Sequence, residues 1–187
     1  MQHRKPTVRF AAVAALMSLA LSACDAPVTP TEVSAEAKRA AGPGASQQDL
    51  LKALRQETAR FHSVTQAMKA EYASTHECVA VPGLGAMGVH WLNQGLVNPG
   101  FDPLRPEALL YEPKANGGLR LVGVEYIVIN VGQPRPSFGG QLFDIGGVQP
   151  LTEAGVAHWS LHVWLWEENP RGMFFPFNPA VSCAAAE

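Results

Sequence analysis

The sequence predicts an α+β fold in which one long amphipathic helix packs on an antiparallel sheet of about four strands. Three observations lead to this prediction. Apolar residues recur at helical spacing from Leu50 to Tyr72, and beyond that point the apolar residues alternate with a period of two. The dipeptide Asn116-Gly117 lies between two such alternating segments, where it predicts a hairpin turn.

The predicted helix has a clear start. Ser46 is followed three residues later by Asp49, a pattern that favours a capping box at a helix N-terminus. Apolar residues then recur at intervals of three, four and seven positions, and they are Leu50, Leu54, Phe61, Val64, Met68 and Tyr72. We therefore expect one amphipathic helix of about 25 residues whose apolar stripe faces the sheet.

Four later segments have the period of a β-strand. They are residues 86–93, 106–113 and 119–130, and a segment that begins at His158 and ends before Asn169-Pro170. Residues 131–156 are rich in glycine and proline, so we expect a long loop there. A curved sheet on a helix would be analogous to cystatin-like or NTF2-like folds, and this analogy concerns the fold alone.

The N-terminus has the features of an export signal. Residues 1–23 carry the basic residues Arg4, Lys5 and Arg9 near their start. The apolar run from Phe10 to Leu21 that follows is too short to span a bilayer. The run ends in Leu21-Ser22-Ala23-Cys24, which resembles the lipobox of bacterial lipoproteins. The resemblance implies that residues 1–23 are a signal peptide and that Cys24 carries a lipid. The alternative is an ordinary secretory signal with an incidental cysteine.

A lipid on Cys24 would place the protein in the cell envelope, attached to a bacterial membrane and facing the periplasm or the cell exterior. Several acyl chains make a stable anchor, because each buried methylene contributes about 0.8 kcal/mol. Residues 24–46 are rich in Ala, Pro, Ser and Thr and are expected to form a flexible tether. Residues 47–187 are then long enough for a single globular α+β domain.

The net charge of the chain limits the classes of partner that it can bind. Without residues 1–23 the chain keeps 11 Lys and Arg against 16 Asp and Glu, a formal charge of −5 with histidine neutral. Because nucleic-acid binding requires a basic surface, we expect no nucleic acid as a partner. The membrane, reached through the lipid anchor, is the partner that the sequence predicts.

The cysteine count predicts a disulfide. Lipidation of Cys24 leaves Cys78 and Cys183, and an even number of cysteines in an oxidising compartment favours a bridge between them. The alternative is two buried free thiols. Neither cysteine belongs to a C-x-x-C motif, so nothing indicates redox catalysis or a zinc knuckle.

Polar residues interrupt the apolar strands at a few positions. In residues 119–130 strict alternation puts Leu119, Leu121, Gly123, Glu125, Ile127 and Ile129 on one face, and the other face is also largely apolar. A carboxylate in the middle of such a central strand needs a partner, a proton or a metal. The candidates for a metal or polar site are Glu125 together with His90, His162, His158 and His62.

Two interpretations of these residues stay open. Two or three imidazoles and a carboxylate suit zinc, copper or iron(II), or acid–base chemistry. Alternatively, His162 and Glu125 form a satisfied pair in the core. His158 and His162 are about 13 Å apart along an extended strand and cannot share one metal without a bulge. We expect His162 to point inward near Glu125 and His90, and His158 to lie near the sheet edge.

The sequence contains no G-x-S-x-G elbow of an α/β-hydrolase. The leading functional hypothesis is therefore a non-enzymatic binding or envelope-structural domain that uses no cofactor. Its tryptophans either line an apolar or sugar-binding groove or belong to the core. The alternative hypothesis is a metal-binding protein or metalloenzyme that holds a divalent transition metal through His90, Glu125 and His162.

Several sequence blocks together resemble an uncharacterised family of exported bacterial proteins and lipoproteins. The blocks are GAMGVHWLN, PEALLYEP, LVGVEYIV, LHVWLW, NPRGMF and FNPAVSC, and they extend from about Thr58 to Cys183. The resemblance implies export and the extent of the domain. It implies no activity, because none is established for that family.

The lipid anchor can be tested by metabolic labelling with a palmitate analogue. We expect the protein to be labelled and the Cys24→Ala variant to be unlabelled. A mature wild-type protein that is soluble and carries no label would contradict the prediction.

Overall fold

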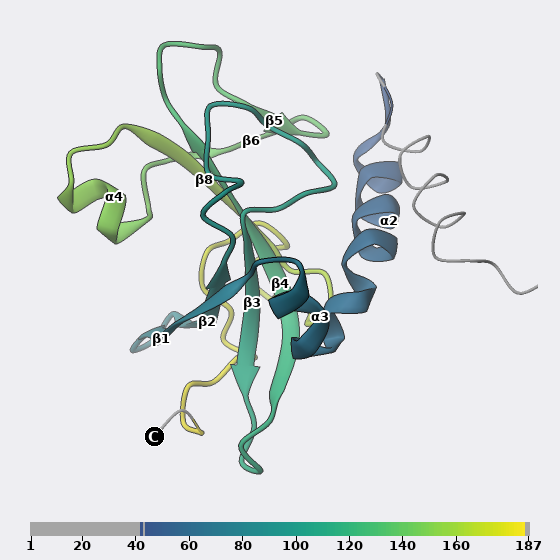
Figure 1. Cartoon of the computed structure of the whole chain (residues 1–187), viewed down its shortest axis with the longest axis vertical. Helices are drawn as coiled ribbons and strands as arrows, with labels where there is room; N and C mark the ends of the chain where they lie inside the picture. Colours follow the sequence, from purple (N-terminus) through teal and green to yellow (C-terminus); the bar gives the residue numbers. More distant parts are fainter. Residues whose placement is uncertain (1–41, 43, 186–187) are drawn as a thin grey trace, which may run out of the picture.

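Residue 42 and residues 44–185 are described by the computed structural model, which has helices beside an antiparallel sheet (Figure 1). The predicted signal peptide, Cys24 and most of the tether lie outside the described residues. The helical elements are α2 (Gln47–Thr58), η1 (Ala59–His62), α3 (Val64–Lys69) and α4 (Gln149–Glu153). The strands are β1 (Ala73–Val81), β2 (Gly85–Leu92), β3 (Ala108–Pro113), β4 (Leu119–Ile129), β5 (Ser137–Phe138), β6 (Gln141–Leu142), β7 (Asp144–Ile145) and β8 (His158–Val163).

The predicted single helix of about 25 residues is wrong, because a 3-10 turn divides it into α2 and α3. α2 does begin at the predicted capping box, where Ser46 and Asp49 each accept a hydrogen bond from the backbone N–H of the other. Ser63 is extended, with φ −92° and ψ 112°, and this interrupts the helical path before α3. No helix in the described part of the chain is long and apolar enough to cross a membrane.

Tertiary contacts account for the division of the helix. The ring of Phe61 packs edge-on against Tyr72, with centroids 5.2 Å apart. The carbonyl of Phe61 accepts a hydrogen bond of 2.5 Å from the hydroxyl of Tyr111 in β3. Past this turn the predicted stripe is kept only in part: Val64 and Tyr72 still pack in the main core, but Met68 is 62% exposed.

An antiparallel sheet is confirmed, but it has six strands in the order β1-β2-β3-β4-β8-β7 rather than about four. The sequence pattern missed β1, in which most side chains are exposed, and β7, which has two residues. It also missed β5 and β6, which form a separate hairpin inside residues 131–156. The long antiparallel pair β3–β4 occupies the centre of the sheet (Figure 1).

The sheet has two covered faces with different partners. On the helical face, residues of α2, η1 and the central strands form the main apolar core, which includes Leu54, Phe61, Leu109, Tyr126 and Leu161. On the opposite face a smaller cluster consists of Ala86, Leu110, Val122, Trp164 and Val181. Val181 comes from residues 172–185, called here the C-terminal strap, so the strap covers part of the second face.

A β-bulge in β4 changes which residues share a face. Leu110 pairs with Gly123, but the next residue, Tyr111, pairs with Leu121, so Val122 is an extra residue in β4. Strict alternation wrongly placed Leu121 on the face of Glu125. Leu121 instead packs in the main core, and Val122 packs in the smaller cluster on the opposite face.

The predicted disulfide between Cys78 and Cys183 is confirmed, with an S–S distance of 2.05 Å. It joins β1 to the C-terminal strap across a sequence separation of 105 residues. A loop of this size lowers the entropy of the unfolded chain by an amount equivalent to about 4–5 kcal/mol. The bridge therefore stabilises both the edge of the sheet and the strap that crosses it.

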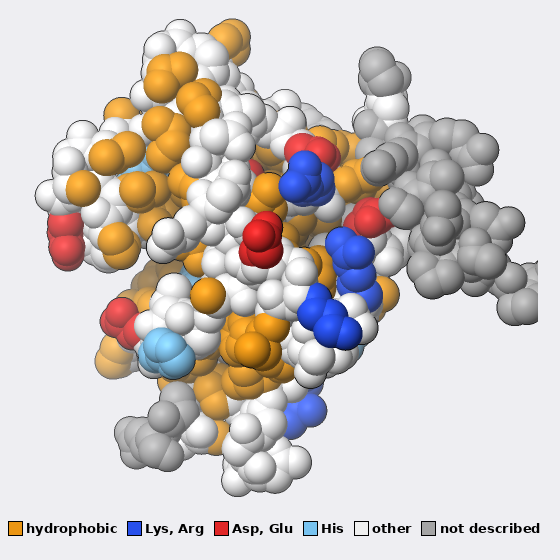
Figure 2. All heavy atoms as spheres, in the orientation of Figure 1, with side chains coloured by type: hydrophobic (Ala, Val, Ile, Leu, Met, Phe, Trp, Pro, Cys, Tyr) orange, Lys and Arg blue, Asp and Glu red, His pale blue; other side chains and the backbone are white. Residues whose placement is uncertain are grey.

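Exposed apolar side chains gather on the lobe that contains α4 and the segment around β5–β7 (Figure 2). Ile145 is 79% exposed, Val131 68% and Leu142 50%. The hairpin of this lobe contacts the start of α2, because the amide of Gln47 donates to the carbonyls of Phe138 and Gly139. The lobe is therefore attached to the point where the chain enters the domain.

Glu107 is a buried carboxyl group, 3% exposed, that completes the hydrogen bonding of β4. β3 starts at Ala108, which pairs with Glu125. The next amide of β4 that points towards β3, that of Ile127, therefore has no partner in β3. The amide of Ile127 donates instead to Glu107 Oε2 at 2.9 Å. Burial raises the pKa of Glu107 to about 8, although the bond from Ile127 partly offsets this.

Substitution Glu107→Gln should change the pH dependence of stability. Because the pKa of Glu107 is raised from 4.5 to about 8 on folding, its contribution to stability is complete below pH 4.5 and is lost as the pH rises towards 8. This loss amounts to at most about 1.4 kcal/mol per pH unit. Urea unfolding between pH 5 and 8 should show a smaller decline for the variant, and parallel profiles would contradict the assignment.

Candidate metal site

Three side chains from three strands converge on the face that the C-terminal strap partly covers. His90 comes from β2, Glu125 from β4 and His162 from β8. Each residue offers one ligand atom, and these atoms all lie within 4.8 Å of one another. The sequence predicted this grouping, and it needs only one histidine of the His158–His162 pair.

The register of the sheet produces the convergence. Glu125 pairs directly with His162, so their side chains leave the same face of adjacent strands. On its other side Glu125 pairs with Ala108, whose methyl group leaves space above β3. His90 reaches across this space, and its Nε2 lies 3.3 Å from Glu125 Oε2.

Gly123 also provides space beside the cluster. A Cβ at this position would lie 2.8 Å from the carbonyl oxygen of Val163 and 3.3 Å from both Leu110 and the indole of Trp164. A side chain there would push β8 or Trp164 away from β4. The sequence shows the glycine, but only the neighbouring strand shows why it is needed.

The two buried members of the cluster have protonation states that suit a metal. Burial by itself would raise the pKa of Glu125, but the nearby imidazoles of His162 and His90 outweigh burial and hold it below its usual value. Burial lowers the pKa of His162, and the charge of Glu125 offsets this in part. At neutral pH the cluster therefore contains a carboxylate and a neutral imidazole at His162.

His162 is buried, with 4% of its side chain exposed, and it is incompletely bonded. Its Nδ1 lies 3.8 Å from Glu125 Oε1, which is longer than a hydrogen bond. Its Nε2 is buried and has no hydrogen-bond partner among the described residues. Its ring stacks on Trp164, with centroids 6.4 Å apart and planes at 25°. A buried imidazole in this state carries an unsatisfied polar atom, which is unfavourable unless another ligand is present.

His158 differs from its expected position, because it is 4% exposed and not at an open edge. β7 and the loop that follows it cover this end of β8. The ring Nε2 of His158 accepts a hydrogen bond from the amide of Val148, and its Nδ1 donates to the carbonyl of Val156. Both ring nitrogens are satisfied, so His158 fixes the loop and is not a member of the ligand group.

His62 is also outside the cluster. It is exposed at the end of η1, and its ring packs edge-on against Trp166 with centroids 4.5 Å apart. The tryptophans mostly belong to the core: Trp91, Trp159 and Trp164 are buried, and Trp166 is half-buried. They do not form the apolar groove that was one interpretation of the sequence.

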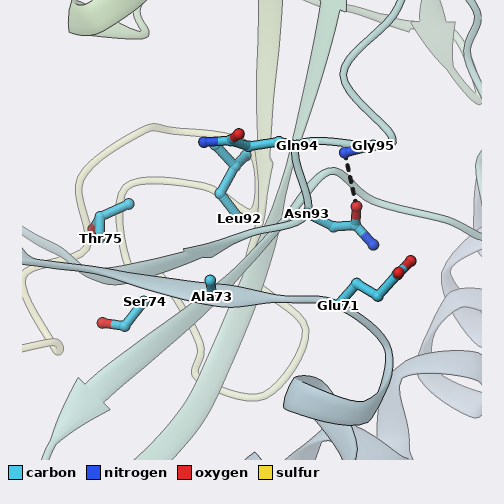
Figure 3. A pocket seen from close by; sticks show the side chains of 8 residues that line it. All are labelled: Glu71, Ala73, Ser74, Thr75, Leu92, Asn93, Gln94 and Gly95. Carbon is cyan, nitrogen blue, oxygen red and sulfur yellow. Dashed lines mark hydrogen bonds between the residues drawn. The ribbon is translucent and has the colours of Figure 1, made fainter.

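A cavity of about 470 Å³ lies elsewhere, between the start of β1 and the end of β2 (Figure 3). It is lined by Glu71, Ala73, Ser74, Thr75, Leu92, Asn93, Gln94 and Gly95. Asn93 is occupied within the fold, because it donates to the carbonyl of Ala70 and accepts from the amide of Gly95. The cavity contains no member of the His–Glu cluster.

Comparison with known proteins supplies no relative. No protein-family model matches the chain, and neither a curated protein nor a solved structure does. The geometry of the cluster is therefore the observation from which a function is argued.

His158→Ala should destabilise the protein by about 2–3 kcal/mol, because it removes a buried imidazole and leaves the half-buried amide of Val148 and carbonyl of Val156 without partners. The exposed His62 is a matched control, and His62→Ala should change stability by less than about 0.5 kcal/mol. Urea unfolding at pH 7 measures both. Equal and small losses would show that His158 does not hold the loop.

Proposed function

We propose that this protein is a lipid-anchored protein of the bacterial cell envelope that binds a divalent transition-metal ion through His90, Glu125 and His162. The observation that carries the proposal is the convergence of three potential ligand atoms within 4.8 Å. The proposal is reinforced by the buried Nε2 of His162, which has no hydrogen-bond partner within the described part of the chain. A core ion pair needs neither a second imidazole nor an unsatisfied nitrogen.

The residue types suit the chemistry of a metal. Two imidazoles and one carboxylate are a ligand set used for zinc and for non-haem iron(II), and sets of three protein ligands leave a position for water. Ligand atoms 2.0–2.1 Å from a tetrahedral metal are separated by about 3.3 Å. The three ligand atoms must therefore move closer together than 4.8 Å to bind a metal, which small side-chain rotations of His90 and His162 can achieve.

The burial of the cluster determines how a metal enters it. The side chain of His90 is 16% exposed, whereas those of Glu125 and His162 are each 4% exposed. A metal would thus arrive from the side of His90 and keep its open position towards solvent. The negative charge of Asp144 in β7 also acts on His162 and favours a cation.

Binding is better supported than catalysis. A metalloenzyme needs a cavity beside the open position that holds the substrate. The cavity of about 470 Å³ at β1 and β2 and a second cavity of about 200 Å³ near Phe101 and Arg105 are both lined by residues outside the cluster. Because both cavities are lined by residues outside the cluster, a non-enzymatic role in holding or transferring a metal fits the structure better than catalysis does.

The proposed location depends on sequence features. Leu21-Ser22-Ala23-Cys24 supports lipidation, and the disulfide between Cys78 and Cys183 is typical of an oxidising compartment. The lipid would hold the domain on a membrane through residues 24–46. The domain would then meet metal ions in the periplasm or at the cell exterior.

Metal content and affinity test the proposal. Protein purified without a histidine tag should contain about one zinc or other transition-metal ion per chain, measured by elemental analysis. Zn²⁺ titration of the metal-free protein should saturate at the same ratio. The variants His90→Ala, Glu125→Gln and His162→Ala should each weaken binding by at least about tenfold.

His62→Ala and His158→Ala serve as matched controls, because both remove an imidazole outside the cluster. They should leave the Zn²⁺ affinity unchanged in folded protein. The proposal fails if wild-type protein binds no metal, or if His62→Ala weakens binding as much as His162→Ala does.

A further inference from the structure

The C-terminal strap is fastened to the same face of the sheet as the candidate metal site. Its Asn178 and Ala86 of β2 exchange two backbone hydrogen bonds of 2.9 and 3.1 Å. Val181 is 4% exposed and packs in the smaller cluster with Trp164. Cys183 then forms the disulfide with Cys78 of β1.

Trp164 connects the strap to His162. Its backbone amide donates to the carbonyl of Met173, and its indole N–H donates to the carbonyl of Phe175 at 2.7 Å. The ring of His162 stacks on the ring of the same tryptophan. The strap therefore fixes the aromatic surface against which one ligand is oriented.

Cys78 connects the disulfide to His90. Cys78 pairs with Val89, the residue directly before His90 in β2. The pairing of β1 with β2 is irregular on both sides of Cys78, with register shifts between Ser74 and Cys78 and between Val79 and Ala80. The disulfide thus holds a poorly matched part of the edge strand against the segment that carries the second imidazole.

From these contacts we propose that the Cys78–Cys183 disulfide controls the metal affinity of the His90–Glu125–His162 site, so that reduction of the bridge weakens metal binding. The proposal rests on the proposed metal-binding function. The disulfide is the covalent attachment between β1 and the strap. Without it, strap and edge strand can separate, and both histidines lose the supports that orient them.

The chemistry needs a dithiol reductant. Both cysteines are half-buried, so a reductant can reach them. One thiolate of the reductant attacks a sulfur of the bridge and forms a mixed disulfide, and its second thiolate then displaces the remaining cysteine. Two electrons and two protons pass to Cys78 and Cys183, which become thiols, and the reductant becomes a disulfide. The metal keeps its oxidation state throughout, and only its affinity for the site falls.

The test compares Zn²⁺ affinity in full-length, detergent-solubilised protein without a histidine tag. The disulfide-bonded wild type is compared with the Cys78→Ser/Cys183→Ser double variant, which imitates the open bridge and has no thiols to bind zinc. We expect binding to weaken by about threefold or more, a smaller effect than loss of a direct contact to a ligand. A change below about threefold overturns the proposal.

A second variant keeps the test decisive if the double variant does not fold. Val181→Ala retains the disulfide but loosens the strap over Trp164, so it should also weaken Zn²⁺ binding. Val64→Ala removes the same groups from the helical face, where Val64 packs against the main core, and should leave affinity unchanged. Equal affinities in Val181→Ala and Val64→Ala overturn the coupling. Absence of Zn²⁺ binding in the oxidised wild type instead overturns the proposed function itself.

Discussion

The burial of Glu125 in the middle of the central strand β4 is the constraint on which this structure depends. An ionised carboxylate with 4% of its side chain exposed is unfavourable by several kcal/mol unless charges or hydrogen bonds compensate it. Here the compensation comes from two imidazoles on different strands, His90 and His162. His90 reaches Glu125 over the small side chain of Ala108 on β3, and Gly123 lets β8 and Trp164 lie close to β4.

The burial of Glu125 also makes the two faces of the sheet chemically different. The helical face is almost entirely apolar, and just before the start of β3 the carboxyl group of Glu107 supplies the missing acceptor for Ile127. The other face combines the charged cluster with the smaller apolar cluster under the C-terminal strap. The bulge at Val122 makes this possible, because it moves Leu121 into the main core and turns Val122 towards the strap.

The two histidines of β8 show how a structural residue differs from a candidate ligand. His158 has both ring nitrogens hydrogen-bonded to the backbone of a nearby loop, and these bonds hold that loop in place. His162, four residues later, has one nitrogen 3.8 Å from a carboxylate and one with no partner in residues 44–185. Both are equally buried, so burial alone does not distinguish them. Completeness of hydrogen bonding does, and it is the reason that a metal is proposed at one and not at the other.

The sequence by itself determined the α+β class, the helix start at Ser46, the four inner strands β2, β3, β4 and β8, and the pairing of Cys78 with Cys183. These follow from local periodicity, capping chemistry and a count of two cysteines. It also indicated His90, Glu125 and His162 as one group, since a carboxylate in an apolar strand requires partners. Only the tertiary structure decided the rest. The 3-10 turn at Phe61 depends on Tyr111, fifty positions away, and the edge strands β1 and β7 have no apolar period to reveal them. The burial of His158 depends on the loop that folds back over β8, and the bulge at Val122 depends on register, which is a property of two strands and not of one.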